Sequence, residues 1–323
     1  MAGTAAAAVI VERPLDPAKF RDPHRTAKGE QRATVVLKRL RTLWFNTGTL
    51  CNLTCRNCYI ESSPKNDSLI YLSAAEVSEY LDEIERDGLG TEEIGFTGGE
   101  PFMNPEFPAM LEDALRRSYR VLVLTNGMRP MMKMSASLLA LKQRYPQRLV
   151  VRVSIDHYSR SLHELERGSR SWGPVVAGLK WLVENGFVVH VAGRRFSGEP
   201  ETVLRAGYDR LFREYSLPID AGDPIQLALF PEMDATKDVP EITTACWDIL
   251  RVSPDAIMCA TSRMVIKRKG AARPAVVSCT LLPYDPQFEL GRTLREASGG
   301  VPLNHPHCAR FCVLGGASCS VLG

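Results

Sequence analysis

Three cysteines stand close together in the run LCNLTCRNCYI, which extends from Leu50 to Ile60 of the 323-residue sequence. Cys51, Cys55 and Cys58 form a CxxxCxxC array, and all three thiolates can face one metal centre if this loop folds back on itself. Soft thiolates select zinc, copper(I) or iron–sulfur clusters. Zinc sites usually combine paired CxxC units with a fourth cysteine or histidine at short range, which this run lacks. The array therefore favours an iron–sulfur cluster with one iron left free of protein ligands. The alternative is three unrelated buried thiols.

The elements that must position these cysteines are alternating strands and helices. Short apolar runs predict strands at residues 42–46, 93–96, 121–124, 149–155, 187–192 and 225–230. Helical signals lie between them, at residues 73–87, 104–118, 131–144, 172–185 and 202–215. This order of apolar strands and helices predicts an α/β fold whose parallel sheet curls into a barrel or partial barrel. Chemistry in such barrels is located at the carboxyl ends of the strands, where the polar turns of this sequence stand.

Two motifs together resemble those of the radical S-adenosylmethionine (SAM) superfamily. The first is CNLTCRNCY around the cysteine array, and the second is Thr97-Gly98-Gly99-Glu100-Pro101, after the second predicted strand. The resemblance runs from about Thr42 to Phe230 and implies a partial (β/α)6 TIM-type barrel. It implies a [4Fe–4S] cluster on Cys51, Cys55 and Cys58, with SAM bound at the open iron. Reductive cleavage of SAM would then release a 5′-deoxyadenosyl radical that abstracts hydrogen from a substrate.

The resemblance also implies which residues contact SAM. Glycines let a backbone edge approach a ligand without interference from a Cβ atom, so the glycine-rich turn is expected to receive the SAM amino group. Tyr59 is expected near the adenine, or else packs the loop. Polar residues at other strand ends are expected near the ribose or the methionyl carboxylate, or else are capping or solvated residues. The expected cofactor-binding residues are Tyr59, Thr97, Gly98, Gly99, Glu100, Asn126, Ser154, Asp156 and Arg194.

After Phe230 the alternation of strands and helices ends. Residues 258–269 and 275–282 predict two strands joined by a turn at Gly270, and residues 291–297 predict a short helix. We therefore expect three parts: an N-terminal tail over residues 1–38, flexible or wrapping; the barrel over residues 39–235; and a small cysteine-rich β-hairpin domain over residues 236–323.

The C-terminal cysteines suggest a second cluster. Cys259, Gly270 and Cys279 resemble the opening of a twitch or SPASM auxiliary-cluster domain, although the glycine stands farther from the second cysteine than that pattern has it. The resemblance implies one further [4Fe–4S] cluster, while a zinc site or plain thiols stay open as alternatives. The expected ligands are Cys259, Cys279, Cys308 and Cys312, with Cys319 as an alternate. Of the remaining candidates, Cys246 is expected to be a buried thiol, and His305 and His307 to be surface residues or further ligands.

Composition restricts the compartment and the partners. The net charge of +3 is too small to indicate nucleic acid or membrane as the main partner. Nine cysteines, with three of them clustered, suit a reducing cytoplasm in which thiols act as ligands. The sequence starts with a short apolar run that lacks a basic region, and no segment approaches the ~18 apolar residues that span a bilayer. We expect a soluble cytoplasmic protein.

These observations predict a radical SAM enzyme that acts on a peptide or a small molecule, with net oxidation, cross-linking or rearrangement. An electron donor such as flavodoxin or ferredoxin is implied, and no catalytic residue is assigned. The basic residues Lys267, Arg268 and Lys269, with Arg263 and Arg273, predict a solvated face or a docking surface for an acidic partner. The alternative is a non-catalytic iron–sulfur or zinc protein that uses the barrel for binding or electron transfer. The glycine-rich turn argues against that alternative, because electron transfer alone needs no SAM pocket.

Overall fold

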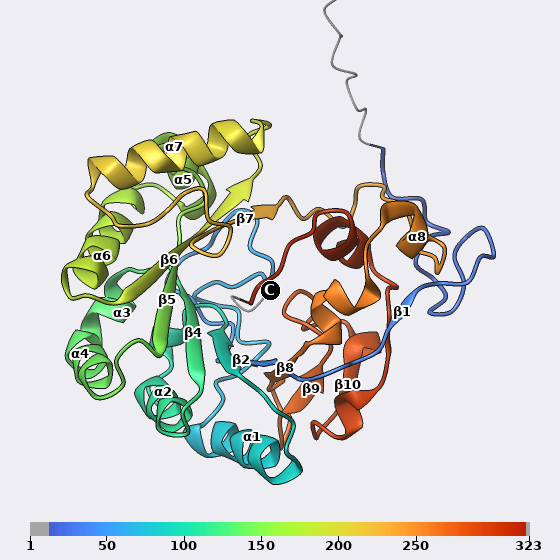
Figure 1. Cartoon of the computed structure of the whole chain (residues 1–323), viewed down its shortest axis with the longest axis horizontal. Helices are drawn as coiled ribbons and strands as arrows, with labels where there is room; N and C mark the ends of the chain where they lie inside the picture. Colours follow the sequence, from blue (N-terminus) through green and yellow to red (C-terminus); the bar gives the residue numbers. More distant parts are fainter. Residues whose placement is uncertain (1–12, 321–323) are drawn as a thin grey trace, which may run out of the picture.

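A computed structural model describes residues 13–320 of the chain. Its central element is a curved sheet with strand order β10-β9-β8-β2-β3-β4-β5-β6-β7 (Figure 1). The strands from β2 to β7 run parallel to their neighbours. Their bounds are β2 (Thr42–Asn46), β3 (Glu93–Thr97), β4 (Arg120–Thr125), β5 (Leu149–Ser154), β6 (Val188–Arg195) and β7 (Leu227–Pro231). The fold is therefore α/β with a mostly parallel sheet that curls into a partial barrel, and all six strands predicted from apolar runs are confirmed.

Helices cover the outer face of this sheet (Figure 1). They are α1 (Ala74–Asp87), α2 (Phe107–Arg116), α3 (Arg129–Lys133), α4 (Ser135–Arg144), α5 (Arg160–Arg167), α6 (Trp172–Glu184) and α7 (Glu201–Glu214). Helix α1 begins and ends at the residues that the sequence predicts. Ser73 and Glu76 form a reciprocal capping box, and Gly88 ends the helix in the left-handed conformation. Apart from α5, these helices pack their apolar faces on the strands in one continuous core.

The predicted and observed helices of the barrel differ in three ways. The helix expected over residues 131–144 is two helices, α3 and α4, which meet at Met134. The helix expected over residues 104–118 begins only at Phe107, because a short turn, η1 (Pro101–Met103), precedes it. The third difference is α5, which sequence reasoning missed because its eight residues are mostly polar and carry no extended apolar stripe.

The C-terminal strands extend the barrel sheet. β8 (Ser262–Ile266) pairs parallel with β2, β9 (Ala275–Val277) pairs antiparallel with β8, and β10 (Glu289–Gly291) pairs antiparallel with β9. β8 is buried along its whole length because it lies between β2 and β9. Both predicted strands were too long, since residues 258–260 form the 3-10 turn η3 and β9 ends at Val277. The helix expected over residues 291–297 is only the turn η5 (Glu296–Ser298).

The basic residues of this region are largely neutralised. Arg263 is buried and donates to the carbonyl oxygens of Cys259 and Ala297, so it is not part of a solvated or docking surface. The next three basic residues each form an ion pair with a carboxylate on a neighbouring segment. The pairs are Lys267–Glu76, Arg268–Glu289 and Lys269–Asp67.

Residues 13–38 wrap around the C-terminal part of the chain. Arg32 is buried and forms an ion pair with Glu241 at 2.5 Å. β1 (Thr34–Val35) pairs antiparallel with β11 (Val301–Pro302) in a separate small sheet. The rest of the expected N-terminal tail, residues 1–12, lies outside the described residues. The remaining elements are α8 (Cys246–Leu250) and the turns η2 (Pro254–Ala256), η4 (Pro286–Phe288) and η6 (Cys308–Val313).

The segment after η6, a π-helical turn, enters the interior of the barrel. Arg152 on β5 is almost fully buried and donates from Nη1 to the carbonyl oxygen of Cys319 at 2.8 Å. The hydroxyl of Ser320 donates to Glu93 at the start of β3 at 2.7 Å. These two bonds fix the segment inside the sheet. Within residues 13–320, no helix is long and apolar enough to cross a bilayer.

Candidate functional site

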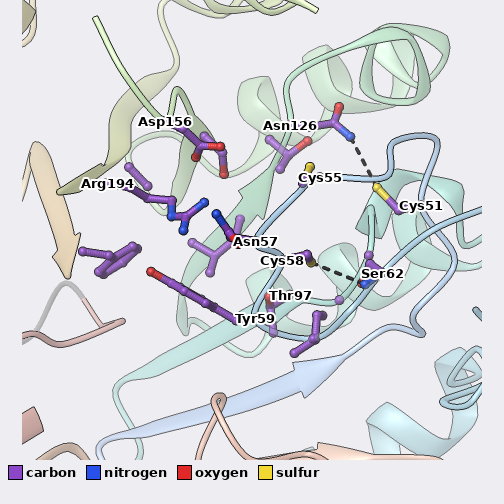
Figure 2. A pocket seen from close by; sticks show the side chains of 18 of the residues that line it. Cys51, Cys55, Asn57, Cys58, Tyr59, Ser62, Thr97, Asn126, Asp156 and Arg194 are labelled. Carbon is purple, nitrogen blue, oxygen red and sulfur yellow. Dashed lines mark hydrogen bonds between the residues drawn. The ribbon is translucent and has the colours of Figure 1, made fainter. Parts of the chain in front are cut away.

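A cavity of about 1070 Å³, its open mouth included, lies at the carboxyl ends of the barrel strands. The cysteine loop forms one wall, and Figure 2 shows Asp156 and Arg194 on the side of the cavity away from Cys51, with Arg194 beside Asn57 and Tyr59 of the loop. The lining includes all three cysteines of the array and eight of the nine predicted cofactor-binding residues. These residues are Cys51, Cys55, Cys58, Tyr59, Thr97, Gly98, Gly99, Asn126, Ser154, Asp156 and Arg194. The fold thus brings together positions more than 140 residues apart in sequence.

Backbone bonds hold the cysteine loop against the barrel. The amide of Cys51 donates to Ser63 O at 3.1 Å, and the amide of Arg56 donates to Glu166 O at 2.8 Å. Glu166, on α5, also accepts from Asn57 Nδ2 at 3.0 Å through its carboxylate. The helix that sequence reasoning missed is therefore the support for the loop. Glu166 and its neighbour Arg167 were missed with it, and no short-range signal in the sequence marks them.

The thiols lie in surroundings that suit iron ligands. Burial raises the pKa of Cys51 to about 12 and also raises the pKa of Cys55. A thiolate therefore forms here only with a compensating positive charge, which bound iron would supply. Backbone N–H groups point at two of the sulfur atoms: that of Leu53 donates to Cys51 Sγ and that of Ser62 donates to Cys58 Sγ, each at 3.4 Å. Figure 2 shows the second of these bonds. Such bonds tune iron–sulfur clusters. Within residues 13–320, no three Cys, His, Asp or Glu side chains are placed to hold a single metal ion.

The glycines of the turn after β3 are needed for packing against the cysteine loop. A Cβ atom on Gly99 would lie 2.2 Å from Leu50 O, and one on Gly98 would lie 2.6 Å from Gly48 O. Gly98 also has a φ of +143°, which other residues rarely adopt. The amide of Gly99 uses this close approach to donate to Gly48 O at 2.8 Å. The two motifs of the resemblance are therefore in direct backbone contact.

Glu100 is the one predicted cofactor-binding residue that does not line the cavity. Its buried carboxylate accepts from Thr125 Oγ1 and from the amide of Asn126, both at 2.8 Å, and from the amide of Phe102 at 3.3 Å. Burial raises the pKa of Glu100 to about 7. In this structure the side chain joins the end of β3 to the end of β4.

Two arginines form a buried charge network on the far wall. Arg167 binds the carboxylate of Asp156 through two bonds of 2.9 and 3.0 Å. Burial acts to raise the pKa of Asp156, but the Arg167 guanidinium outweighs it and the net effect is a lowered pKa. Arg194 binds Glu166 and Glu232, each at 2.8 Å. The guanidinium of Arg194 also lies over the Tyr59 ring, 5.6 Å from its centroid. Both arginines are thus fixed by carboxylates.

A second, smaller cavity, about 340 Å³ with its open mouth included, is lined by four cysteines. They are Cys259, Cys279, Cys308 and Cys312, the four expected as ligands of an auxiliary cluster. The π-helical turn η6 carries two of them on one face. Burial raises the pKa of Cys259 to about 12 and raises the pKa of the other three thiols as well. The remaining wall is mostly apolar, so these four thiols too would lose their protons only beside a bound cation.

The other candidates of the C-terminal region lie elsewhere. Cys319 lines the first cavity instead of the second, and its thiol lies 3.2 Å from Thr280 Oγ1. Cys246 is only partly buried, contrary to expectation, because it stands at the start of the exposed helix α8. His305 and His307 are also partly buried, and burial lowers the pKa of both rings. His307 lines the second cavity.

The fold and the site define a class of protein: a partial α/β barrel that can hold an iron–sulfur cluster and a ligand at its strand ends. Residues 45–202 match the sequence profile of the Radical SAM superfamily. The matched segment runs from β2 to the start of α7, so this part of the barrel is similar to that superfamily. The match does not extend to the C-terminal region with the second cavity.

Two curated relatives match less than half of the chain. The antilisterial bacteriocin subtilosin biosynthesis protein AlbA of Bacillus subtilis is 35% identical over 143 residues, which are 44% of this chain and 30% of AlbA. The mycofactocin maturase MftC of Mycobacterium ulcerans is 31% identical over 137 residues, 42% of this chain and 35% of MftC. The matched segment therefore spans about a third of these relatives.

Solved structures support the fold. Streptococcus suis SuiB bound to S-adenosylmethionine superposes with a TM-score of 0.57 at 11% identity, over 79% of this chain and 64% of SuiB. Native anSMEcpe with bound AdoMet gives a TM-score of 0.57 at 14% identity, over 79% of both chains. At these identities the likeness concerns the fold alone.

Proposed function

We propose that this chain is a radical SAM enzyme that reductively cleaves SAM and abstracts hydrogen from a peptide. The observation that carries the proposal is the first cavity, where the cysteine array, the glycine-rich turn and the buried charge network meet. When bound, the cluster and SAM supply the radical chemistry. The non-catalytic iron–sulfur or zinc alternative explains the cysteines but gives no reason for so large a cavity beside them.

The residues present fit the two groups. Cys51, Cys55 and Cys58 would hold the cluster, and the cavity beyond them would hold SAM. Ser62 and Arg194 line this cavity, and one buried side-chain atom of each, Ser62 Oγ and Arg194 Nε, has no hydrogen-bond partner among the described residues. Buried polar atoms are rarely left unpaired, so their position favours a polar ligand. The contacts from Tyr59, the glycine-rich turn and the far wall stay predictions, while Glu100 would act by positioning Asn126.

The second cavity would hold an auxiliary [4Fe–4S] cluster in a twitch-like C-terminal domain. Four thiols around one small space satisfy the full ligand set of such a cluster. Cys319 is then not a ligand. Thr280 lines the first cavity, Cys279 lines the second, and Leu281 lines both. The segment of these three residues therefore forms the wall between the two proposed cofactors. Electron exchange between them would need no further protein group.

A peptide is favoured over a nucleotide as substrate. A nucleotide requires cations for its phosphates, yet Arg167 and Arg194, the arginines that line the cavity, are both bound by carboxylates. The relatives AlbA and MftC are named for bacteriocin biosynthesis and for maturation. A flavodoxin or ferredoxin stays the proposed electron donor. The ion-paired residues Lys267–Lys269 offer it little free charge, so its docking surface should lie elsewhere.

The test is anaerobic reconstitution with iron and sulfide, followed by iron counts and a dithionite-driven assay for 5′-deoxyadenosine. We compare wild type with two multiple variants and with Cys246→Ala as a matched control outside both cavities. One variant replaces Cys51, Cys55 and Cys58 by alanine. The other replaces Cys259, Cys279, Cys308 and Cys312 by alanine.

Wild type and the control are expected to bind about eight iron atoms, and each multiple variant about four. Only the variant of the array should lose all 5′-deoxyadenosine. About four irons in wild type, and none after removal of the array, would refute the auxiliary cluster. Zinc in place of iron, without 5′-deoxyadenosine, would refute the enzyme. Stimulation of SAM cleavage by nucleoside triphosphates but by no peptide would refute the substrate class.

A further inference from the structure

One buried thiol in the first cavity has no role in either proposed cluster. Cys319 lines the cavity together with the cysteine array, but it does not line the second cavity. Its side chain is 6% exposed. The sulfur lies 3.2 Å from Thr280 Oγ1, which belongs to the wall between the cavities. A free thiol therefore faces the space in which the proposed radical would form.

The position of this thiol is fixed by the fold. Arg152 Nη1 donates to the carbonyl oxygen of Cys319, and the next residue, Ser320, donates to Glu93. Arg152 and Glu93 stand on β5 and β3, inside the barrel. Because these hydrogen bonds hold Cys319 and the next residue to two barrel strands, the thiol cannot easily leave the cavity for the second cluster.

The same cavity carries independent signs of a bound ligand. Ser62 and Arg194 line this cavity, and one buried side-chain atom of each, Ser62 Oγ and Arg194 Nε, lacks a partner among the described residues. These atoms belong to the cysteine loop and to β6, while Cys319 enters from the C-terminal segment. The thiol thus faces a ligand site and is not merely packed in a core.

We propose that Cys319 is a catalytic hydrogen-atom donor, which returns a hydrogen atom to the substrate carbon after abstraction. This inference rests on the proposed function. The S–H bond of Cys319 breaks homolytically, the hydrogen atom goes to the carbon radical, and a thiyl radical stays on the sulfur. One electron and one proton then restore the thiol. The electron comes from the same class of one-electron reductant that drives SAM cleavage, a reduced iron–sulfur or flavin donor, and dithionite replaces it in the assay.

The reaction is then redox-neutral for the substrate. The substrate loses one hydrogen atom and regains one, so its composition is unchanged and only the configuration of a carbon atom can differ. Sulfur–hydrogen bonds are weaker than most carbon–hydrogen bonds, so the transfer from thiol to carbon runs downhill. Burial raises the pKa of Cys319 to about 11, which keeps the hydrogen on the sulfur at neutral pH. This outcome differs from the net oxidation or cross-link that the sequence predicts.

The test uses reconstituted enzyme with SAM and dithionite in D2O, without a substrate. The Cys319 thiol exchanges to S–D, and a radical formed beside it takes deuterium from it. We compare wild type with Cys319→Ser, whose O–H bond is too strong to donate, and with Cys246→Ser as the matched control. Cys319→Ala is the second variant, and iron is counted in every sample. We expect deuterium in the 5′-deoxyadenosine of wild type and control, and its loss in both Cys319 variants at unchanged iron content.

Three results would overturn the inference. Deuterium that persists in both Cys319 variants would show that another group donates. A loss of about four irons in both variants would make Cys319 a cluster ligand. Variants with full iron that form no 5′-deoxyadenosine would make Cys319 part of SAM cleavage itself. Wild type that forms no 5′-deoxyadenosine would instead refute the proposed function, and the inference with it.

Discussion

Replacing Glu100 by glutamine tests how the ends of β3 and β4 are joined beneath the cavity. The buried carboxylate accepts three hydrogen bonds, from Thr125, Asn126 and Phe102. Burial nevertheless raises its pKa from 4.5 to about 7. Between these two pH values the folded chain holds a proton that the unfolded chain has lost. The protonation of Glu100 therefore adds to the free energy of unfolding at low pH, and this contribution is lost as the pH rises through 7.

The size of the effect follows from the two pKa values. The free energy of unfolding of wild type is expected to fall by about 2–3 kcal/mol between pH 5 and pH 8 because of this group. Glutamine resembles the protonated acid in shape and carries no charge at either pH. Glu100→Gln should therefore match wild type near pH 5 and exceed it in stability at pH 8.

The measurement is pulse proteolysis in increasing urea at pH 5, 6.5 and 8, at matched iron content. Glu112→Gln, which changes an exposed carboxylate on α2, is the control and should follow wild type at every pH. Parallel pH profiles for wild type and Glu100→Gln would refute the reasoning, because the carboxyl group would then titrate alike in the folded and unfolded chains. A variant that is less stable at pH 8 would show that the three hydrogen bonds outweigh burial.

Two further predictions concern packing and charge. Gly178→Ala on α6 should lower the free energy of unfolding by at least about 3 kcal/mol, because its Cβ would lie 1.8 Å from Gly127 O. Gly173→Ala on the same helix is the control. Its Cβ meets nothing within 4 Å, so this variant should raise the free energy of unfolding by up to about 1 kcal/mol. Denaturant titration of both variants checks this, and equal values would contradict the packing described. Asp156→Asn leaves Arg167 without its carboxylate and should cost about 3–5 kcal/mol. A thermal melt indistinguishable from wild type would contradict that pair.

The sequence predicted the barrel well because its signals are local. Each parallel strand is a short run of apolar residues buried on both faces, and α1 has a capping box and a glycine stop that act within a few residues. The CxxxCxxC array and the glycine-rich turn are equally local. Their direct contact, Gly99 with the loop at Gly48, is long-range, and only the resemblance indicated it.

The parts that sequence reasoning missed depend on tertiary contacts. α5 is short and polar, and it is stable because Glu166 binds the cysteine loop and Arg194. Glu100 was expected at the ligand because the motif contains it, but its carboxylate accepts hydrogen bonds from Thr125 and Asn126 at the end of β4 and from Phe102 in η1. No pattern in the sequence distinguishes an inward from an outward direction at a strand end.

The last two cysteines of the chain also show that sequence spacing does not indicate which cavity a side chain faces. Cys312 and Cys319 are seven residues apart, and by spacing alone either could be a ligand of the auxiliary cluster. The π-helical turn η6 ends at Val313, and beyond it the chain leaves the second cavity for the barrel interior. There the buried Arg152 binds the carbonyl oxygen of Cys319, so a charge on β5 decides which cavity the thiol faces. Replacing Arg152 should therefore alter the deuterium content of 5′-deoxyadenosine more than the iron content, since it loosens the donor and leaves the four proposed ligands in place.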